Sequence, residues 1–447
     1  MFLPSNKAQI SDLFRFSKFL VFNDQTINCS TLKGKGSMLD KKRILLHLPL
    51  ELLPTDSGSK SKHLSFLKYL NNRREFLEVD VFSINYFHAP RWTLEQRREV
   101  LKYVENFYVY EGENNLLDYV YSRVKSFYHQ KILHRQLPVD TDYFTPPGYI
   151  RFVQSIVSQH KYDFIWINEL DYAYLALKSL KYPIHVILDV VDIRSKLRLV
   201  QKNIYPFVGL KFDYTSNLKR EIELMKKFDT IVITSQEEMT LVKPSIPSHK
   251  LHLIPYTVEI TDTKQPMISY QSRIFKYDLL FVGTHYAPNA EGINFFLNSI
   301  LPIIIREQPN IKLAIVGKVV ELLQLDPASN QNVFCLGFIP DLTEIYLTSK
   351  LVICPLLSGS GTKIKLQEAM TYAIPIVTTI TGASGLSLKD GINAFITDEP
   401  ELYAQRVLNL LKEPKLAQKL SEEVAMTFEN EYSNSAIYSK LDAMLGI

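Results

Sequence analysis

The amino-acid sequence predicts an α/β protein that carries two parallel sheets, each flanked by helices. Strand-like apolar runs alternate with helix-like segments in both halves of the 447-residue chain. Because parallel neighbours in a sheet need crossover connections, such alternation is typical of parallel sheets covered by helices. A chain of this length with 46% hydrophobic residues can fill two separate cores.

The positions of these runs set the expected boundaries. Strand-like runs occupy 43–48, 79–84, 163–168, 184–191, 229–235 and 251–256 in the first half, and 277–283, 311–318, 351–356 and 374–379 in the second. A polar stretch without a clear period, which contains Pro266, separates the halves and favours a linker. We expect an N-terminal extension at 1–40, a first domain at 41–256, a linker at 257–276, a second domain at 277–425 and a C-terminal helix at 426–447.

Two segments leave a membrane contact open as an alternative. Residues 116–136 place aromatic residues at helical spacing, which favours a core face with Arg123, Lys125 and Lys131 in solvent. A basic and aromatic membrane-facing surface is the alternative for this helix. For 10–22, where Asp12 interrupts the apolar residues, we favour packing or local disorder over a helix that lies on a membrane.

A glycine-rich stretch, S-G-S-G-T-K-I-K-L-Q-E-A-M at 358–370, follows the strand-like run 351–356 and leads into a helix. Its glycines free the backbone to approach a ligand closely, and Thr362 is placed to cap the helix. The N–H groups of the first helical turn attract phosphate oxygens, and Lys363 and Lys365 add positive charge. Glu368 lies where a carboxylate can accept both hydroxyls of a ribose. An ordinary turn with a surface ion pair between Lys365 and Glu368 is the alternative.

Three motifs in order give this region a family resemblance. They are F-V-G-T at 281–284, G-S-G-T-K-I-K-L-Q-E-A-M at 359–370 and T-G-A-S-G at 381–385. The block from 277 to about 411 resembles the C-terminal, donor-binding domain of retaining GT-B glycosyltransferases, most closely glycosyltransferase family 4 (glycosyl transferases group 1). This resemblance implies two Rossmann-like domains that face each other across a cleft. It also implies a nucleotide-diphosphate-sugar donor and a hexosyltransferase-like transfer to an acceptor hydroxyl.

The resemblance assigns the donor side of the site. The expected donor-binding residues are Gly283, Thr284, His285, Gly359, Ser360, Gly361, Thr362, Glu368 and Gly382. Many relatives carry two glutamates separated by seven residues, and here Ser360 stands at the first position. Relatives often show a histidine before an aspartate in the first domain, whereas this chain has Val191 before Asp192. The contacts to the sugar would then pass to the backbone around Ser360 and to His285.

The acceptor side is expected on the first domain. The turn before the helix at 60–70 places Gly58 and Ser59 toward the cleft, with simple helix capping as the alternative. Asp192 and Arg194 follow a buried strand, at the end of a sheet where α/β proteins bind ligands. We expect both side chains to bind acceptor hydroxyls, and a structural pair of Asp192 with Arg194 or Arg198 remains open.

The expected mechanism rests on charge at the leaving group. Lys363, Lys365 and Asp192 are the catalytic candidates, because cations and fixed N–H donors stabilise the departing phosphate. No metal ligand pattern appears, so no metal and no cofactor are expected besides the donor itself. The resemblance implies retention of configuration. An inverting GT-B transferase or an epimerase is the alternative, with Asp56, His63 or Asp192 as its base. A catalytically silent nucleotide-sugar-binding protein also remains open.

The composition of the chain limits the classes of molecule that it is expected to bind. The 51 basic and 47 acidic residues leave a net charge of +4, which argues against nucleic acid. Cys335 and Cys354 lie in apolar runs and predict core packing rather than a disulfide or zinc site, in keeping with a cytoplasmic protein. We expect a UDP- or GDP-sugar donor and a carbohydrate, lipid-linked or protein acceptor. A peripheral contact with the inner face of a membrane stays open.

Overall fold

The structure is a computed structural model. It describes residues 41–52, 58–85, 92–112, 115–138, 140–180, 183–201, 211–256, 270–323, 331–359 and 361–447. The predicted N-terminal extension, its segment 10–22, Asp56 and most of the predicted linker lie outside these ranges. Within them, no helix combines the length and apolar character needed to cross a membrane.

The N-terminal half is built on a seven-stranded sheet in which all neighbouring strands run parallel, in the order β3-β2-β1-β4-β5-β6-β7. Its strands are β1 (Lys42–His47), β2 (Leu77–Asn85), β3 (Asn106–Glu111), β4 (Phe164–Asn168), β5 (His185–Val190), β6 (Thr230–Ile233) and β7 (Leu251–Leu253). Its helices are α1 (Gly58–Asn72), α2 (Leu94–Val100), α3 (Leu116–Phe127), the π-helix η2 (Tyr128–Ile132), α4 (Pro147–Gln159), the 3₁₀ helix η3 (Leu170–Tyr172), α5 (Tyr174–Ser179), α6 (Arg194–Gln201), α7 (Tyr214–Met225), α8 (Gln236–Val242) and the 3₁₀ helix η4 (Ser248–Lys250).

The C-terminal half is built on a six-stranded parallel sheet in the order β10-β9-β8-β11-β12-β13. Its strands are β8 (Tyr277–Val282), β9 (Leu313–Val316), β10 (Val333–Gly337), β11 (Ser349–Cys354), β12 (Ile376–Thr378) and β13 (Phe395–Ile396). Its helices are η5 (Tyr270–Ser272), α9 (Ala287–Phe295), η6 (Phe296–Ile300), α10 (Leu301–Glu307), η7 (Lys318–Leu322), α11 (Thr343–Leu347), α12 (Ile364–Thr371), α13 (Ile380–Ala383), α14 (Pro400–Lys412), α15 (Pro414–Glu431) and α16 (Asn434–Leu445).

Alternation along the central strands builds a core on each face of each sheet. In β1, Leu45 joins one buried cluster, while Ile44 and Leu46 join another. In β8, Leu280 and its neighbour Phe281 likewise belong to different clusters. Because successive side chains of a strand point to opposite faces, helices must cover both sides of each sheet. The predicted α/β class with two Rossmann-like parallel-sheet halves is confirmed.

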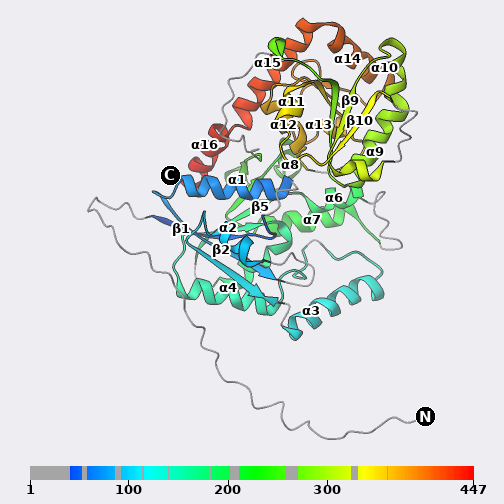
Figure 1. The fold of residues 1–447 in the computed structure, drawn as a ribbon. Coiled ribbons are helices and arrows are strands. Elements are labelled where there is room, and N and C mark those ends of the chain that lie inside the picture. The colour runs from blue at the N-terminus through cyan, green and yellow to red at the C-terminus, as the bar shows by residue number, and fades with distance from the viewer. Residues whose placement is uncertain are drawn as a thin grey trace, which may run out of the picture. The chain divides into compact units, whose positions relative to one another are not determined.

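The last helix, α16, packs against the N-terminal half. Ile437, Leu441 and Leu445 of α16 are buried in the same cluster as residues of β1 and α1. The guanidinium of Arg73 donates two hydrogen bonds to Asp442, at 2.9 and 2.8 Å, and Tyr69 donates a third at 2.8 Å. Figure 1 shows the red α16 running toward the blue α1. The helix therefore ties the end of the chain to its first strand and helix.

Two packing predictions are wrong. Cys354 is buried, but Cys335 is exposed because it lies on β10, an edge strand of its sheet. The helix predicted at 116–136 forms as α3 and η2, but its large apolar side chains are exposed, and Lys125 forms an ion pair with Asp142 instead of lying free in solvent. Side chains beyond the helix decide its orientation, which its own periodicity does not reveal.

Candidate active site

The turn between β11 and α12 has the backbone that its glycines predict. Gly359 has φ +124° and Gly361 has φ +72°, and both values lie in a backbone region that residues other than glycine rarely adopt. Gly361 also lies against the N-terminal half, since a Cβ built there would stand 2.8 Å from Oδ1 of Asp192. Ser360, between them, lies outside the described residues. Two glycines thus shape a tight turn ahead of a helix N-terminus.

Thr362 does not cap α12, contrary to the sequence expectation. Lys363 takes the N-cap position and α12 begins at Ile364. The hydroxyl oxygen of Thr362 is buried and, among the described residues, meets no hydrogen-bond partner. A buried hydroxyl without a partner costs free energy, so this oxygen is suited to a ligand that enters the turn.

Lys365 joins the glycine-rich turn to the loop after β8. Its Nζ donates to Oδ1 of Asn289 at 2.6 Å and lies 4.8 Å from the ring centre of Phe281. The side-chain amide of Asn289, in the first turn of α9, donates to the backbone oxygen and the hydroxyl of Thr284. Burial lowers the pKa of Lys365. The alternative of a surface pair with Glu368 therefore does not describe this lysine.

Lys363 lies at the junction with the N-terminal half. Its side chain is buried, and Nζ donates to the backbone oxygen of Gly361 at 2.8 Å. Burial lowers its pKa to about 8, although the nearby Asp192 carboxylate acts in the opposite direction. A buried cation that is held by one backbone oxygen has donors left for an anionic ligand.

Glu368 lies on α12, one turn beyond Lys365. One carboxylate oxygen accepts a hydrogen bond of 3.0 Å from the hydroxyl of Tyr346, a fully buried residue of α11. Burial raises the pKa of Glu368, while this hydrogen bond and Lys365 act to lower it. Tyr346 also donates to the backbone oxygen of Lys365. The carboxylate is thus held in one orientation on the same helix as Lys365.

The remaining donor-side residues follow the ends of β8 and β12, with Gly283 and His285 in the loop after β8 and Gly382 in α13. A Cβ on Gly283 would meet Phe281 and Val319 at 3.0 Å, and one on Gly382 would stand 2.1 Å from the hydroxyl of Thr378. These two glycines therefore permit close packing of the strand ends. His285 is half-exposed and lies 3.2 Å from the carboxylate of Glu321.

Three contacts hold the loops of the two halves against each other. Gln367 of α12 donates to the backbone oxygen of Tyr256 at 2.9 Å, and Ser384 donates to the carboxylate of Glu237 at 2.5 Å. The third is the approach of Gly361 to Asp192. Glu238, at the start of α8, accepts the N–H of Ile193 at 3.1 Å and so fixes the loop that carries Asp192. Burial raises the pKa of Glu238 to about 7.

Arg194 forms ion pairs with two carboxylates, and Asp192 adds a third negative charge nearby. Its guanidinium lies 2.6 Å from Glu169 and 2.7 Å from Asp171. Burial acts to lower the pKa of Arg194, but the carboxylates of Asp171, Glu169 and Asp192 outweigh it and raise the pKa. Glu169 reaches this position with φ +69°, a strained value for a residue with a side chain. Arg198 instead donates to the backbone oxygen of Leu137 at 2.5 Å.

The structure thus brings most of the predicted site together. Lys363, Lys365, Glu368, Thr362 and the two glycines share one turn and helix, with Asp192 against them. Gly58 begins α1, but its surroundings and the side chain of Ser59 lie outside the described part.

Two residues that position the site, Asn289 and Tyr346, were not expected from the sequence, whereas Glu238 was expected to start a helix and does so in α8. Asn289 left a signal, because a polar residue in the first turn of an apolar helix favours a ligand or loop contact. Among the described residues, no group of three or more His, Cys, Asp or Glu side chains is placed to hold a metal ion.

The chain is similar to known proteins in sequence and in fold. The family described as Glycosyl transferases group 1 matches residues 276–413. An uncharacterized 44.6 kDa protein of the cps region of Klebsiella pneumoniae is 23% identical over 314 residues, which cover 65% of this chain and 76% of that protein.

Two solved structures are similar in fold along most of both chains. Alr3699/HepE of Anabaena, in complex with UDP and glucose, has a TM-score of 0.57 and 15% identity, and the match covers 90% of this chain and 99% of that one. Sucrose-phosphate synthase of Thermosynechococcus elongatus has a TM-score of 0.62 and 14% identity over 91% and 98% of the two chains. Alr3699/HepE has also been solved with UDP-glucose. The chain is therefore a glycosyltransferase with the GT-B fold, whose residues 276–413 form a Glycosyl transferases group 1 domain.

Proposed function

We propose that this glycosyltransferase moves a hexose from a UDP-sugar to an acceptor hydroxyl, with retention of anomeric configuration and without a metal ion. The observation that carries the proposal is the arrangement of Lys363, Lys365 and the Thr362 hydroxyl around a glycine turn at the start of α12. Within the part of the chain that the structure describes, this buried hydroxyl has no hydrogen-bond partner. UDP is favoured over GDP because a protein of the same fold has been solved with UDP and with UDP-glucose.

Charge on the leaving group explains why this turn suits the reaction. When the bond from the anomeric carbon to the diphosphate breaks, negative charge grows on the departing oxygen. Buried lysines and the N–H groups at a helix N-terminus stabilise that charge more strongly than water does, because they are already oriented. Lys365 approaches from the side of Asn289, and Lys363 from the side of Asp192. The two cations together replace the divalent ion that many sugar transferases use.

The other groups fit the donor and the acceptor. Glu368, oriented by Tyr346, would accept the ribose hydroxyls of the nucleotide. Asp192 lies beside Gly361, where the sugar would meet the N-terminal half, so it is placed to receive or orient the acceptor hydroxyl. In the retaining pathway the leaving phosphate itself takes the proton of that hydroxyl. The acceptor is a carbohydrate, a lipid-linked sugar or a protein, and the cytoplasm is the compartment that we assign.

A donor screen tests this proposal. Purified protein would be incubated with UDP- and GDP-sugars in the presence of EDTA, and the released nucleotide diphosphate would be measured with and without candidate acceptors. We expect one UDP-sugar to be consumed, and the Lys365→Met variant to lose turnover more than UDP affinity. A matched control is Lys350→Met, which removes a half-exposed surface lysine paired with Asp278.

Three results would each change the assignment. Activity that disappears with EDTA and returns with magnesium or manganese would overturn the metal-free mechanism. A product whose anomeric proton shows inverted configuration by NMR would favour the inverting alternative. Binding of UDP-sugars without release of UDP under any acceptor condition would indicate a catalytically silent protein. Ser360 and Val191 suggest this alternative, because relatives often carry a glutamate and a histidine at these two positions.

A further inference from the structure

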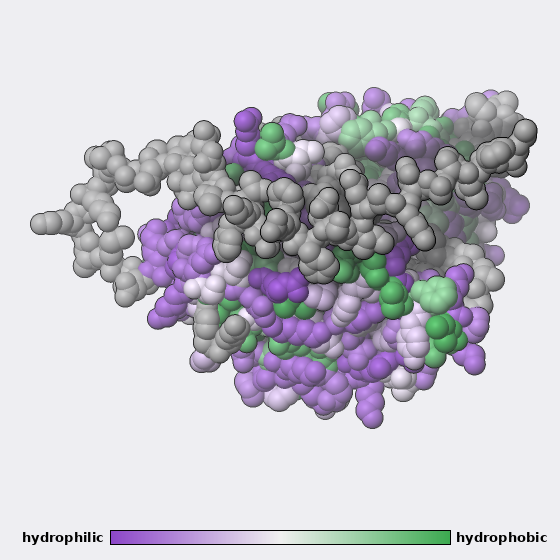
Figure 2. Space-filling model, turned by 90° about the horizontal axis from the view of Figure 1, so that it is seen from below, coloured by the Kyte–Doolittle hydropathy of each residue, from purple (hydrophilic) through white to green (hydrophobic). Residues whose placement is uncertain are grey.

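An exposed apolar surface lies on the N-terminal half, on α3 and the π-helix η2 that continues it. Leu116 and Leu117 are 73% and 76% exposed, which is unusual for two adjacent leucines in a helix. We define the α3 apolar face as the seven exposed large side chains of this segment: Leu116, Leu117, Val120, Val124, Phe127, Tyr128 and Ile132. Figure 2, which views the molecule from below, shows green hydrophobic residues at the surface on its right-hand side, where Figure 1 places α3.

The opposite side of this helix is polar and faces the protein. Asp118 and Ser122 are buried, at 1% and 3% exposure. Asp118 accepts hydrogen bonds from the hydroxyl of Tyr110 at 2.7 Å and from the N–H of Gly148 at 3.0 Å. Ser122 donates to the backbone oxygen of Tyr143 at 3.3 Å. The helix is thus amphipathic in the reverse sense to a helix that covers a core.

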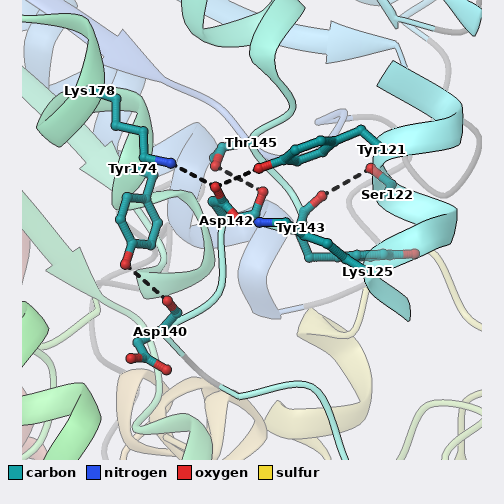
Figure 3. Close-up of polar contacts among 9 residues, drawn as sticks. All are labelled: Tyr121, Ser122, Lys125, Asp140, Asp142, Tyr143, Thr145, Tyr174 and Lys178. Carbon is teal, nitrogen blue, oxygen red and sulfur yellow. Dashed lines mark hydrogen bonds and ion pairs between the residues drawn. The ribbon is translucent and has the colours of Figure 1, made fainter. Parts of the chain in front are cut away.

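A second polar cluster, centred on Asp142, holds the helix in this orientation (Figure 3). Tyr121 donates to Asp142 at 2.7 Å, and Lys125 and Lys178 form ion pairs with the same carboxylate. Figure 3 shows these side chains reaching toward Asp142 from α3 and from α5. If α3 rolled to bury its apolar face, these bonds would break, and buried polar groups would lose their partners. The exposure of the apolar face is therefore built into the fold.

The charge of the segment identifies what covers this face. Between residues 115 and 138 the chain has four lysines and arginines, at 123, 125, 131 and 135, whereas Asp118, which is buried, is the sole acidic residue. Arg123 and Lys131 are exposed on the same side as the apolar residues. An exposed apolar face that carries cations and no exposed carboxylate is complementary to a surface of anionic lipid headgroups. A second copy of the chain fits less well, since a symmetric contact would bring Arg123 and Lys131 toward their own counterparts.

We propose that the α3 apolar face docks this protein onto the surface of an anionic lipid membrane. The segment that follows η2 connects this surface to the acceptor side of the site. Arg198 of α6 donates to the backbone oxygen of Leu137, and α6 begins at Arg194, two residues after Asp192. The loop that carries Asp192 is thus joined through α6 to the segment that follows the α3 apolar face, a connection that suits a lipid-linked acceptor. This last step rests on the proposed function, whereas the docking itself does not.

Vesicle flotation tests the docking. Full-length protein would be floated with vesicles of phosphatidylcholine alone or with about one third phosphatidylglycerol, at low and high salt. We expect binding to the anionic vesicles that weakens with salt, and a loss of at least roughly tenfold in the Leu117→Glu/Phe127→Glu double variant. Arg123→Gln/Lys131→Gln should weaken binding to anionic vesicles while leaving the apolar face intact. Because all four side chains are exposed, folding should be preserved, and circular dichroism checks it.

The matched control is Leu94→Glu, since Leu94 is a 75% exposed leucine on another helix of the same half. Its binding to vesicles should equal that of the unmodified protein. The proposal is overturned if the unmodified protein does not float with anionic vesicles, or if the double variant and the control float alike. It is also overturned if sedimentation shows a dimer that the double variant dissociates, because a second copy would then cover the face. UDP release in the absence of vesicles reports on the proposed function separately.

Discussion

Glu368 and Lys363 show how burial prepares individual residues for a charged ligand. Both side chains carry charges that burial disfavours, so the pKa of Glu368 is raised and the pKa of Lys363 is lowered. Tyr346 donates a hydrogen bond to the carboxylate, and the backbone oxygen of Gly361 accepts one from the ammonium. A donor whose ribose hydroxyls bind the Glu368 carboxylate and whose phosphate binds the Lys363 ammonium would offset the free-energy cost of burying these two charges.

Replacing Glu368 by alanine should weaken UDP binding. Removing a carboxylate that accepts ribose hydroxyls costs about 1.5–3 kcal/mol, the range for hydrogen bonds to a charged group. Isothermal titration calorimetry measures the change. Glu344→Ala, which removes an exposed carboxylate from the neighbouring α11, serves as the control and should bind UDP normally. An unchanged affinity in folded Glu368→Ala would remove this residue from the nucleotide site.

Lys363 should make UDP binding depend on pH. With a pKa of about 8, its ammonium is charged at neutral pH and loses its proton as the pH rises through that value. A bound diphosphate favours the charged form, so binding near pH 8 to 9 should take up protons and affinity should fall above pH 8. Calorimetry in buffers of different ionisation enthalpy counts these protons. Proton uptake that persists unchanged in Lys363→Met would assign it to another group.

At the scale of elements, much of the fold follows from the sequence. Every strand-like run that we expected became a strand, because long apolar runs flanked by turn residues leave little choice. The expected strands did not include β3 and β13, and β10 was anticipated only as the apolar strand-like run around Cys335. In β3 no residue is fully buried, β10 is an edge strand with an exposed centre, and β13 has two residues, so none of them shows a buried pattern.

The sequence did not predict the orientation of α3 or the side-chain contacts that position the site residues. Asp142 fixes α3 through Tyr121 and Lys125, and Tyr346 fixes Glu368, across separations of 17 to 22 residues. The order of the residues along one element does not show which distant partner will meet it. By contrast, Gly359, Gly361 and the lysines after them share one turn, so local sequence was sufficient to group them.

The turn before α12 should tolerate substitution less than a comparable turn elsewhere. Gly361 and Gly391 have the same φ of +72°, but a Cβ on Gly361 would stand 2.8 Å from Asp192, whereas one on Gly391 meets no described atom within 4 Å. Alanine at either position should lower the free energy of unfolding by the same backbone strain, about 1 kcal/mol. Gly361→Ala should in addition push away the Asp192 loop and lower turnover, as steady-state kinetics would show. Equal turnover in both variants would mean that this contact has no role in the reaction.

For the whole molecule, α16 links the end of the chain to its beginning. Asp442 accepts hydrogen bonds from Arg73 and Tyr69, and these bonds, led by that from Arg73, lower its pKa from 3.8. A carboxyl whose pKa is lower in the folded state stabilises the fold above its unfolded pKa, and the contribution is lost as the pH falls through the folded pKa. The link should therefore be fully formed at neutral pH and weaken below about pH 4.

Asp442→Asn should lower the free energy of unfolding at pH 7 by about 1–2 kcal/mol, a modest value because the pair is partly exposed. Urea unfolding measures it, and the difference from the unmodified protein should shrink below pH 4. Ala443→Asn introduces the same side chain at the next, exposed position of α16 and serves as the control. If both variants unfold at the same urea concentration, the contacts with Arg73 and Tyr69 add nothing to the docking of this helix.

The most direct test of the account as a whole is a crystal structure of the protein with a bound UDP-sugar. We expect the diphosphate to lie against the turn at 359–362 within hydrogen-bonding distance of Lys365 or Lys363, with the ribose hydroxyls on Glu368 and the sugar toward Asp192. A nucleotide bound elsewhere, with Glu368 left on Tyr346 alone and both lysines without phosphate, would contradict the central claim that this turn holds the donor.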